Sequence, residues 1–261
     1  MSYLLIDIGN SYIKYTTYDN NQLSPASLLN SLEFIDALNT HSLKIAELPE
    51  SVVLVSVVDK TLTNNIIDKL TRFYHCQVQR VETSREALGV TCGYSNYSLL
   101  GADRWLAMIA AFSRVKDQSQ ARPVLVVDCG TVVTVDVVDA GGQHLGGWMM
   151  PGSLLMCQAL SQKASGILYG LKNSGSGLDC NTMQNDTPVI GKSTRQCVDV
   201  GGKLAVAGFI EQCFLQAKEL SGIAPLCVFT GGGSKEIIPL LTVQVDYVPD
   251  LVLDGLALFI E

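Results

Sequence analysis

The sequence predicts an α/β fold made of two copies of a hairpin-led α/β unit packed around a cleft. The main observation is an internal repeat: residues 4–10 (LLIDIGN) and 125–131 (LVVDCGT) are apolar runs ending in Asp, a spacer, Gly and a small hydrogen-bonding residue. Each run is followed by a β-rich stretch, residues 11–18 and 132–138, typical of the return strand of a hairpin. Strand-like and helix-like segments then alternate, which favours a sheet with crossover helices. Because the repeat covers a whole supersecondary unit, it indicates the architecture before any local motif does.

The remaining elements of the first half follow from hydrophobic patterning. The expected elements are strands at 43–48, 52–58 and 76–81 and helices at 59–74 and 101–115. A polar connector at residues 116–123 ends in proline and predicts an internal boundary. We therefore expect an N-terminal half over residues 1–118 and a C-terminal half over residues 119–261.

The second half repeats this organisation. Its expected elements are a hairpin at 124–139, a Gly-rich lead-in at 146–152, a helix at 201–218, a strand at 226–230 and a closing helix at 254–260. Residues 165–186 are rich in Gly, Ser and Asn, which predicts a long mobile loop or an insertion.

Composition excludes several classes of function. The chain of 261 residues is 48% hydrophobic and 16% charged, which is enough for one large domain or two ordinary ones. A formal charge of −7 without a long basic cluster argues against binding to nucleic acid. The absence of a long apolar run or a signal-type N-terminus predicts a cytoplasmic protein that does not bind a membrane.

Cysteine and histidine usage argues against a zinc site. The eight cysteines show no C-x-x-C pairing, so we expect reduced, mostly buried thiols. The three histidines lie far from one another in the sequence, and the ligand spacing of a zinc site is missing.

The repeated Asp and Gly residues suggest chemistry. A carboxylate at the end of a buried strand costs free energy unless it is paired or coordinates a cation, and the nearby Gly lets backbone N–H groups approach a phosphate. Taken alone, the Asp7 segment fits an ordinary hairpin turn. The matching Asp128 favours the functional alternative, in which two facing turns grip a nucleotide from both sides.

Two further motifs each allow a structural and a functional interpretation. Asp103 and Arg104 could simply begin a helix, or they could serve as a general base and an anion-binding group. The run Gly231–Gly232–Gly233 could be a plain loop, or it could let the backbone approach a nucleotide base or ribose. By contrast, Gly191–Lys192–Ser193–Thr194 only imitates a P-loop, because Asp186 stands where the upstream Gly is required.

Together these segments resemble type III pantothenate kinases, within the actin, hexokinase and sugar-kinase superfamily. The segments that carry the resemblance occur in the family's order: 7–14 (DIGNSYIK), 101–105 (GADRW), 128–131 (DCGT), 146–152 (GGWMMPG), 190–194 (IGKST) and 230–232 (TGG). The resemblance implies two duplicated ribonuclease-H-like α/β halves around an ATP cleft. It also implies phosphorylation of pantothenate to 4′-phosphopantothenate, the first step of coenzyme A biosynthesis.

The resemblance also implies roles for individual residues. Asp103 would be the catalytic proton acceptor, and Asp128 would bind a monovalent metal ion, K⁺ (or NH₄⁺ in its place). The ATP-binding residues would be Asp7, Ile8, Gly9, Asn10, Ser11, Tyr12, Ile13, Lys14 and Thr131. The pantothenate-binding residues would be Tyr94, Gly101, Ala102, Asp103, Arg104 and Thr194. In this family a homodimer completes the site.

Charge balance adds a requirement for Mg²⁺. Asp7, Asp103 and Asp128 would lie near ATP in an acidic protein, with only Lys14 and Arg104 as motif cations, so a divalent cation is expected on the phosphates. Three other readings stay open: a non-catalytic accessory or regulatory relative, a kinase for another small alcohol, and an actin-like ATP switch. The first would be expected to have lost one of the three aspartates, and large insertions typical of the last are absent.

Overall fold

The polypeptide forms two compact units, each with its own sheet. The first unit contains Met1–Ala121, Val138–Gly146 and Asp250–Glu261, and the second contains Arg122–Val137 and Gly147–Pro249. The computed structural model describes residues 2–40, 42–45, 48–116, 122–163 and 190–260. The boundary expected after residue 118 lies outside the described residues and stays a prediction.

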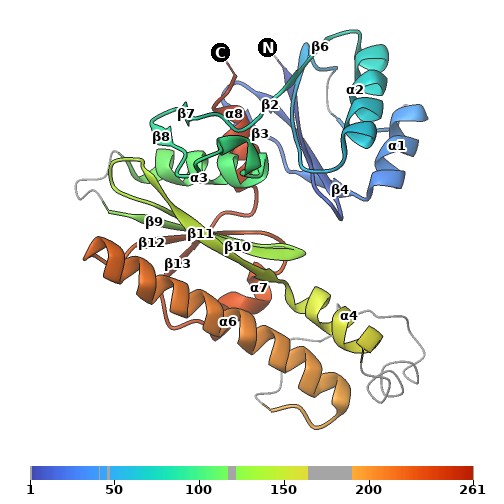
Figure 1. The fold of residues 1–261 in the computed structure, drawn as a ribbon. Helices are drawn as coiled ribbons and strands as arrows, with labels where there is room; N and C mark the ends of the chain where they lie inside the picture. Colours follow the sequence, from blue (N-terminus) through green and yellow to red (C-terminus); the bar gives the residue numbers. More distant parts are fainter. Residues whose placement is uncertain (1, 41, 46–47, 117–121, 164–189, 261) are drawn as a thin grey trace. The chain divides into compact units, whose positions relative to one another are not determined.

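The sheet of the first unit has the strand order β3-β2-β1-β5-β6, with β4 also paired to β2 (Figure 1). Its strands are β1 (Tyr3–Ile8), β2 (Ile13–Asp19), β3 (Gln22–Leu23), β4 (Ser27–Leu29), β5 (Ser51–Ser56) and β6 (Gln77–Arg80). Strand β1 runs antiparallel to β2 and parallel to β5. The predicted return strand after the first Asp motif is therefore confirmed.

The sheet of the second unit has the order β11-β10-β9-β12-β13. Its strands are β9 (Val124–Cys129), β10 (Val132–Val138), β11 (His144–Pro151), β12 (Leu226–Thr230) and β13 (Val245–Tyr247). Strand β12 runs parallel to both β9 and β13. Strand by strand, this sheet matches the first one, with β9 in the place of β1 and β12 in the place of β5. The predicted duplication of a hairpin-led α/β unit is confirmed.

Helices complete both units. They are α1 (Ser31–Asn39), α2 (Lys60–Tyr74), α3 (Ala102–Val115), α4 (Ser153–Lys163), α6 (Thr194–Ser221), α7 (Ser234–Ile237) and α8 (Leu251–Ala257). The minor elements are the 3₁₀ turns Tyr97–Leu99 and Ile238–Leu240 and the short hairpin β7 (Glu86–Ala87) and β8 (Val90–Thr91). Helices α1 and α2 lie side by side along the first sheet (Figure 1). None of the described helices is both long and apolar enough to span a membrane.

Three expected elements need correction. No strand forms among the described residues of the 43–48 run, because Leu43 packs into the core while the Ile45 N–H donates to the Leu43 carbonyl in a local turn. The helix expected at 201–218 is much longer, since Ser193 caps α6 seven residues earlier. The closing helix begins at Leu251 rather than 254. The loop expected at 165–186 lies outside the described residues.

Equivalent positions of the repeat build the two cores. Leu4, Ile6 and Ile8 of β1 belong to one buried cluster, and Leu125, Val127 and Cys129 of β9 occupy the matching positions in the other. Since successive side chains on a strand point to opposite faces, Asp7 and Asp128 lie on the face of β1 or β9 away from these clusters. The alternation that fills each core thus also presents one carboxylate near the end of each first strand.

Helix α8 crosses α3 at a site with no room for a side chain. A Cβ atom at Gly255 would lie 2.5 Å from the Leu106 carbonyl oxygen and 3.0 Å from its Cβ. Leu251, Leu253 and Leu256 of α8 are fully buried around this contact. The close approach therefore depends on glycine, and it fixes the C-terminal helix to the first unit.

We predict that Gly255→Ala lowers the free energy of unfolding by about 1–3 kcal/mol, because the added methyl group forces the two helices apart. Thermal and urea unfolding followed by circular dichroism measure the effect. Gly208→Ala is the matched control, since Gly208 is an exposed helical glycine with open space around it. That variant should be neutral or stabilising by up to about 1 kcal/mol. Equal stability losses in both variants would contradict the packing argument.

Candidate functional site

The first hairpin turn joins β1 to β2 and carries the segment from Asp7 to Lys14. Asp7 and Lys14 are opposite one another in the antiparallel register, and both side chains are half-buried. The Gly9 N–H donates to the Tyr12 carbonyl at 3.0 Å and closes the turn. Asn10 and Ser11 are exposed, so the turn offers polar groups at the surface of the first unit.

Not every residue of this segment can contribute a side chain. Ile8 and Ile13 are fully buried in the core of the first unit, so only their backbone groups are available to a ligand. Tyr12, in contrast, is 54% exposed. The segment therefore divides into two core anchors and an exposed tip.

Lys14 has a partner that the sequence did not single out. Its Nζ lies 3.3 Å from Oδ1 of Asp250, which directly precedes α8. The two side chains are 28% and 36% exposed, so the pair is partly screened by solvent. Asp250 is distant in the sequence and belongs to no recognisable motif, so only the folded chain reveals it beside Lys14.

The second hairpin turn follows β9 and has the same construction. Asp128 is half-buried near the end of β9, and Gly130 and Thr131 are exposed. The Thr131 carbonyl accepts a hydrogen bond of 2.9 Å from the N–H of Gly152, at the end of the 146–152 motif. This contact explains why that motif accompanies the turn.

The Gly231–Gly233 loop packs directly on the Asp128 turn. Gly231 has φ +90°, and a Cβ there would collide with Oδ1 of Asp128 and with the Cys129 carbonyl group. The Gly233 N–H donates to the Cys129 carbonyl at 2.9 Å. Gly231 is therefore required by close backbone approach, while a Cβ on Gly232 would meet open space, and the loop lies beside the carboxylate expected to bind a cation.

An ion cluster around a buried lysine fixes the helix that follows this loop. Lys203 of α6 is only 3% exposed and places its Nζ 3.0 Å from Asp199 Oδ2 and 2.8 Å from Glu236 Oε2 of α7. Burial alone would lower the pKa of Lys203, but the hydrogen bonds to Glu236 and Asp199 raise it above its ordinary value. The lysine therefore stays charged and links α6 to α7.

Thr194 begins helix α6 and is exposed. The preceding Ser193 is the helix cap, since its Oγ accepts from the Gln196 N–H at 3.3 Å. Gln196 Oε1 in turn accepts from the Lys192 N–H at 2.9 Å. The residues that imitate a P-loop tail thus form a reciprocal helix cap.

Asp103 and Arg104 lie in the first turn of α3, just after the cap residue Gly101. Asp103 Oδ1 accepts a hydrogen bond of 2.7 Å from the Arg104 N–H. Arg104 is 8% exposed, and its Nη1 donates to the Tyr94 hydroxyl at 3.1 Å. The first unit therefore brings together three of the residues expected to bind the acceptor.

The loop that carries Tyr94 is held by an arginine that the sequence analysis missed. The Arg85 guanidinium donates to the carbonyls of Cys92, Tyr94 and Ser95 at 3.4, 3.1 and 3.2 Å. It also lies 5.7 Å from the centroid of the Tyr97 ring. A lone arginine in a polar stretch gives no sequence signal, because its partners are backbone carbonyls.

The donor groups of the two turns suit cations that bind few protein ligands. The described residues contain no cluster of three His, Cys, Asp or Glu side chains that could hold a metal. Mg²⁺ keeps several waters and binds mainly to phosphates with one or two carboxylates, so it does not need a cluster of protein ligands. A Cβ on Gly231 would collide with both Asp128 Oδ1 and the Cys129 carbonyl oxygen, so two oxygen atoms of the kind that suit hard cations lie close together there.

Comparisons with solved structures define the fold class of the whole chain. The chain matches a ROK family glucokinase from Streptomyces griseus with TM-score 0.52 and 12% identity, covering 98% of each chain. It matches MreB 5 of Spiroplasma citri with TM-score 0.51 and 9% identity, covering 99% of this chain and 95% of that one. Both structures contain AMPPNP. The protein thus has the fold of the actin, hexokinase and sugar-kinase ATPases.

Sequence comparisons define the family within that class. The family model for type III pantothenate kinase matches residues 3–216. Type III pantothenate kinases of Acidovorax ebreus and Stenotrophomonas maltophilia are 31% and 35% identical, and each alignment covers 98% of this chain and at least 95% of the relative. The chain belongs to the type III pantothenate kinase family, and the expected resemblance is confirmed.

The Cys129 thiol next to Asp128 has a low chemical reactivity. Burial raises its pKa to about 12, with the negative charge of Asp128 adding to the shift and a hydrogen bond with Ser234 opposing it. Cys197, by contrast, is exposed at the start of α6. All seven cysteines in the described part of the chain are free thiols, as the sequence predicted.

We predict that iodoacetamide at pH 8 modifies Cys197 rapidly and spares Cys129. With a pKa of about 12, only about one Cys129 thiol in ten thousand is ionised at this pH, and the thiolate is the reactive form. Peptide mapping by mass spectrometry after timed alkylation measures both rates, with protein unfolded in urea as the control. Alkylation of both cysteines at similar rates in the native protein would contradict the prediction.

Proposed function

We propose that this chain transfers the γ-phosphoryl group of ATP to the hydroxyl group of pantothenate, with Asp103 as the proton acceptor. Membership of the type III pantothenate kinase family carries the activity: the chain is a kinase, pantothenate is its acceptor, and 4′-phosphopantothenate for coenzyme A biosynthesis is its product. The cytoplasm, where ATP is supplied, is the proposed location.

Asp103 acts as the transition state forms, not before it. A carboxylate is too weak a base to ionise an alcohol in advance, so it orients the hydroxyl group and accepts its proton as the bond to phosphorus forms. Phosphoryl transfer has a loose transition state, in which positioning and charge neutralisation dominate. The hydrogen bond from the Arg104 N–H to Asp103 Oδ1 supports this role, because it fixes one carboxylate oxygen at the start of α3.

Arg104 and Tyr94 bind the anionic acceptor, together with Gly101, Ala102 and Thr194. Pantothenate carries a carboxylate, and a guanidinium held in place by a neighbouring hydroxyl is suited to pair with it. The hydrogen bond between Arg104 Nη1 and the Tyr94 hydroxyl supports joint action of these two side chains.

The two hairpin turns bind the ATP phosphates. Lys14 supplies positive charge, while the backbone and polar side chains of residues 7–14 and Thr131 supply hydrogen bonds. Asn10, Ser11 and Thr131 are exposed at the tips of two equivalent hairpins, and this exposure supports the assignment. Asp7 and Asp128 add negative charge near a polyanion, so Mg²⁺ on the phosphates supplies the missing neutralisation when bound.

Asp128 holds a monovalent cation, K⁺ or NH₄⁺. The close packing of Gly231 against Asp128 Oδ1 and the Cys129 carbonyl group supports such a site, because it sets oxygen atoms side by side. A cation at Asp128 would offset the repulsion between this carboxylate and the ATP phosphates.

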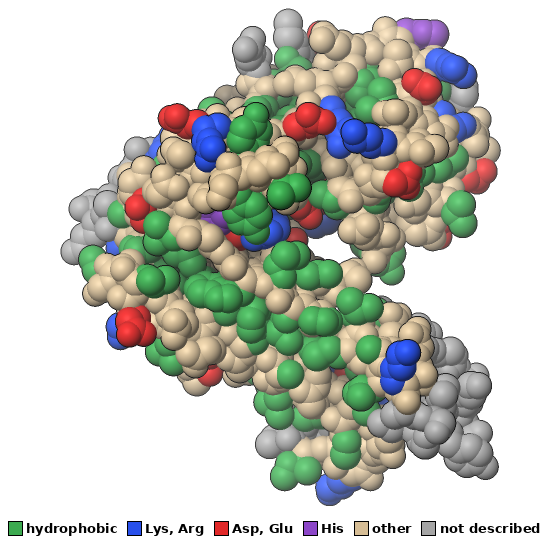
Figure 2. Space-filling view, viewed as in Figure 1, with side chains coloured by type: hydrophobic (Ala, Val, Ile, Leu, Met, Phe, Trp, Pro, Cys, Tyr) green, Lys and Arg blue, Asp and Glu red, His purple; other side chains and the backbone are tan. Residues whose placement is uncertain are grey.

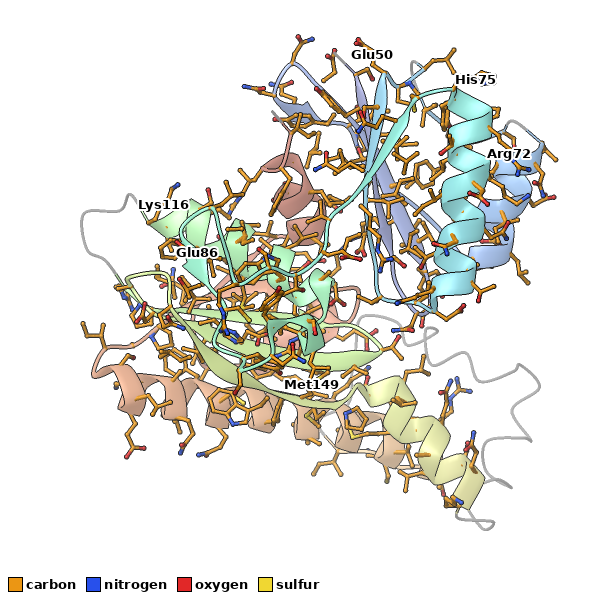
Figure 3. The ribbon with its side chains drawn as sticks, turned by 45° about the horizontal axis from the view of Figure 1, so that its top comes forward. Glu50, Arg72, His75, Glu86, Lys116 and Met149 are labelled. Atoms are coloured by element: carbon orange, nitrogen blue, oxygen red, sulfur yellow. The ribbon has the colours of Figure 1, made fainter. Side chains whose placement is uncertain are left out.

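A homodimer completes the enzyme. Strand β11 is the outer strand of the second sheet, and edge strands with exposed apolar side chains are typical sites of association. Figure 2 shows hydrophobic side chains gathered over β11, α4 and α6. Exposed apolar residues of these elements include Met149 (labelled in Figure 3), Leu154, Leu160 and Leu204. A surface of this kind on a protein of low charge density favours self-association.

The accessory-protein and alternative-alcohol readings are disfavoured by particular residues. A non-catalytic relative has no need to keep Asp7, Asp103 and Asp128 together, and this chain has all three. A kinase for another alcohol has no need of the Arg104–Tyr94 pair, which suits a carboxylate.

We predict that Asp103→Asn lowers kcat by about 10²–10⁴, because the amide cannot accept the hydroxyl proton. The affinity for ATP should change little, since Asp103 acts on the acceptor. A coupled assay of ADP release with pantothenate and Mg²⁺, combined with calorimetric ATP binding, measures both quantities. The matched control is Asp68→Asn on the remote helix α2, which should leave both unchanged. Turnover near the wild-type rate in Asp103→Asn would refute the assignment.

We predict that Asp128→Asn abolishes activation by K⁺ and raises the KM for ATP about tenfold, since an interaction with a charged group contributes about 1.5–3 kcal/mol. Initial rates of wild type and variant, in K⁺ and in Na⁺ buffers of equal ionic strength, test this. A variant that retains wild-type K⁺ activation would show that the cation binds elsewhere.

A further inference from the structure

We propose that His144 is a positioning residue of the acceptor site, and that it holds Tyr94, and through it Arg104, in the place where pantothenate binds. This inference rests on the proposed function and adds a residue that no motif assigned. His144 lies far from Tyr94 in the sequence but in the same compact unit.

The imidazole of His144 packs against the loop that carries Tyr94. It is 1% exposed and stacks on the Tyr94 ring, with centroids 5.8 Å apart and ring planes 20° apart. Its Nδ1 accepts a hydrogen bond of 3.3 Å from the Gly93 N–H. One side chain therefore fixes both the backbone before Tyr94 and the face of the Tyr94 ring.

The backbone around His144 is joined to the same loop. A Cβ on Gly93 would collide with the His144 carbonyl oxygen, so the two segments are in direct contact. The Thr91 N–H donates to the Gly142 carbonyl at 2.9 Å, and Gln143 Nε2 donates to the carbonyls of Thr91 and His144 at 3.4 and 3.0 Å. The tip of the β10–β11 hairpin and the acceptor loop thus form one hydrogen-bonded body.

Tyr94 transmits this placement to Arg104. Its hydroxyl accepts from Arg104 Nη1 at 3.1 Å, and the guanidinium carbon lies 5.7 Å from the ring centroid. Because Arg104 is almost fully buried, its charge depends on the few groups around it for orientation. A shift of the Tyr94 ring would therefore move a group that binds the acceptor.

The burial of His144 indicates that this residue positions Tyr94 and does not contact pantothenate directly. At 1% exposure His144 cannot reach a bound acceptor in this conformation, so its effect passes through Tyr94. A misplacement of about 1 Å in a binding group can reduce catalysis by about 100-fold. We therefore expect changes at His144 to alter use of pantothenate and to spare use of ATP.

Three substitutions separate the two contacts of His144. His144→Leu removes both the stacking ring and the Nδ1 atom that accepts the hydrogen bond from Gly93. It should raise the KM for pantothenate by about 10-fold to 100-fold. His144→Phe keeps the ring, and His144→Asn keeps an acceptor near the position of Nδ1, so each should restore part of the loss. The KM for ATP should stay within about twofold in all three, since positioning acts on the acceptor alone.

A matched control removes a buried polar contact from the same unit at a distance from the loop. Thr63 is fully buried in α2 and shares a 2.7 Å hydrogen bond with Ser56. Thr63→Val should lower stability without changing either KM. The double variant His144→Leu/Tyr94→Leu should be no worse than Tyr94→Leu alone, because both changes remove the same chain of contacts.

Hydrogen–deuterium exchange of wild type and His144→Leu tests the positioning without an activity assay. Faster exchange confined to residues 91–97 is the expected result, and unchanged exchange there would overturn the proposal whatever the kinetics. Equal KM values for pantothenate in wild type and His144→Leu would also overturn it. Wild-type protein that binds ATP but does not phosphorylate pantothenate would instead refute the proposed function, and with it the acceptor role of this loop.

Discussion

The structure depends on one constraint, which is that a carboxylate must stand near the end of the first strand in each sheet without entering the core. In both units this strand lies between its return strand and a parallel neighbour: β1 between β2 and β5, and β9 between β10 and β12. Strand alternation buries residues on either side of Asp7 and Asp128 and leaves these two half-buried. The hairpin turn and the glycine that follows each Asp are consequences of this placement.

The second unit adds a requirement that the first does not share. Its Asp128 turn is packed against Gly231, and the following helix α7 is linked to α6 through the buried charge of Lys203. A buried ion pair gives little net stability, because desolvation offsets the attraction, but breaking it is costly. The contact between Lys203 and Glu236 therefore ties α7, which follows the glycine loop, to α6.

The sequence predicted the repeat, the strand-terminal aspartates and the order of the main elements, because these depend on local alternation and on motifs of a few residues. It did not predict the ion pair of Asp250 with Lys14, the hydrogen bond from Arg85 to the Tyr94 carbonyl, or the stacking of His144 on Tyr94. Lys14 with Asp250 and Tyr94 with His144 join residues from separate parts of the chain, and the partners of Arg85 are backbone carbonyls that leave no pattern in the sequence. The strand predicted at 43–48 was wrong for a different reason. Leu43 and Ile45 pack into the core of the first unit without strand pairing.

The β10–β11 hairpin explains how a duplicated fold acquires different halves. Its base lies beside Thr131 and Gly152 in the second unit, while its tip, with Gly142, Gln143 and His144, belongs to the first. The equivalent strands of the first sheet, β2 and β3, are joined by a short turn at Asn20 and Asn21 and hold no such loop. Extension of one hairpin therefore gives the loop that carries Tyr94 a hydrogen-bonded support from Gly142, Gln143 and His144. Since paired strands are stiff compared with loops, contacts with the hairpin tip constrain the loop that carries Tyr94 more than its own polar sequence could.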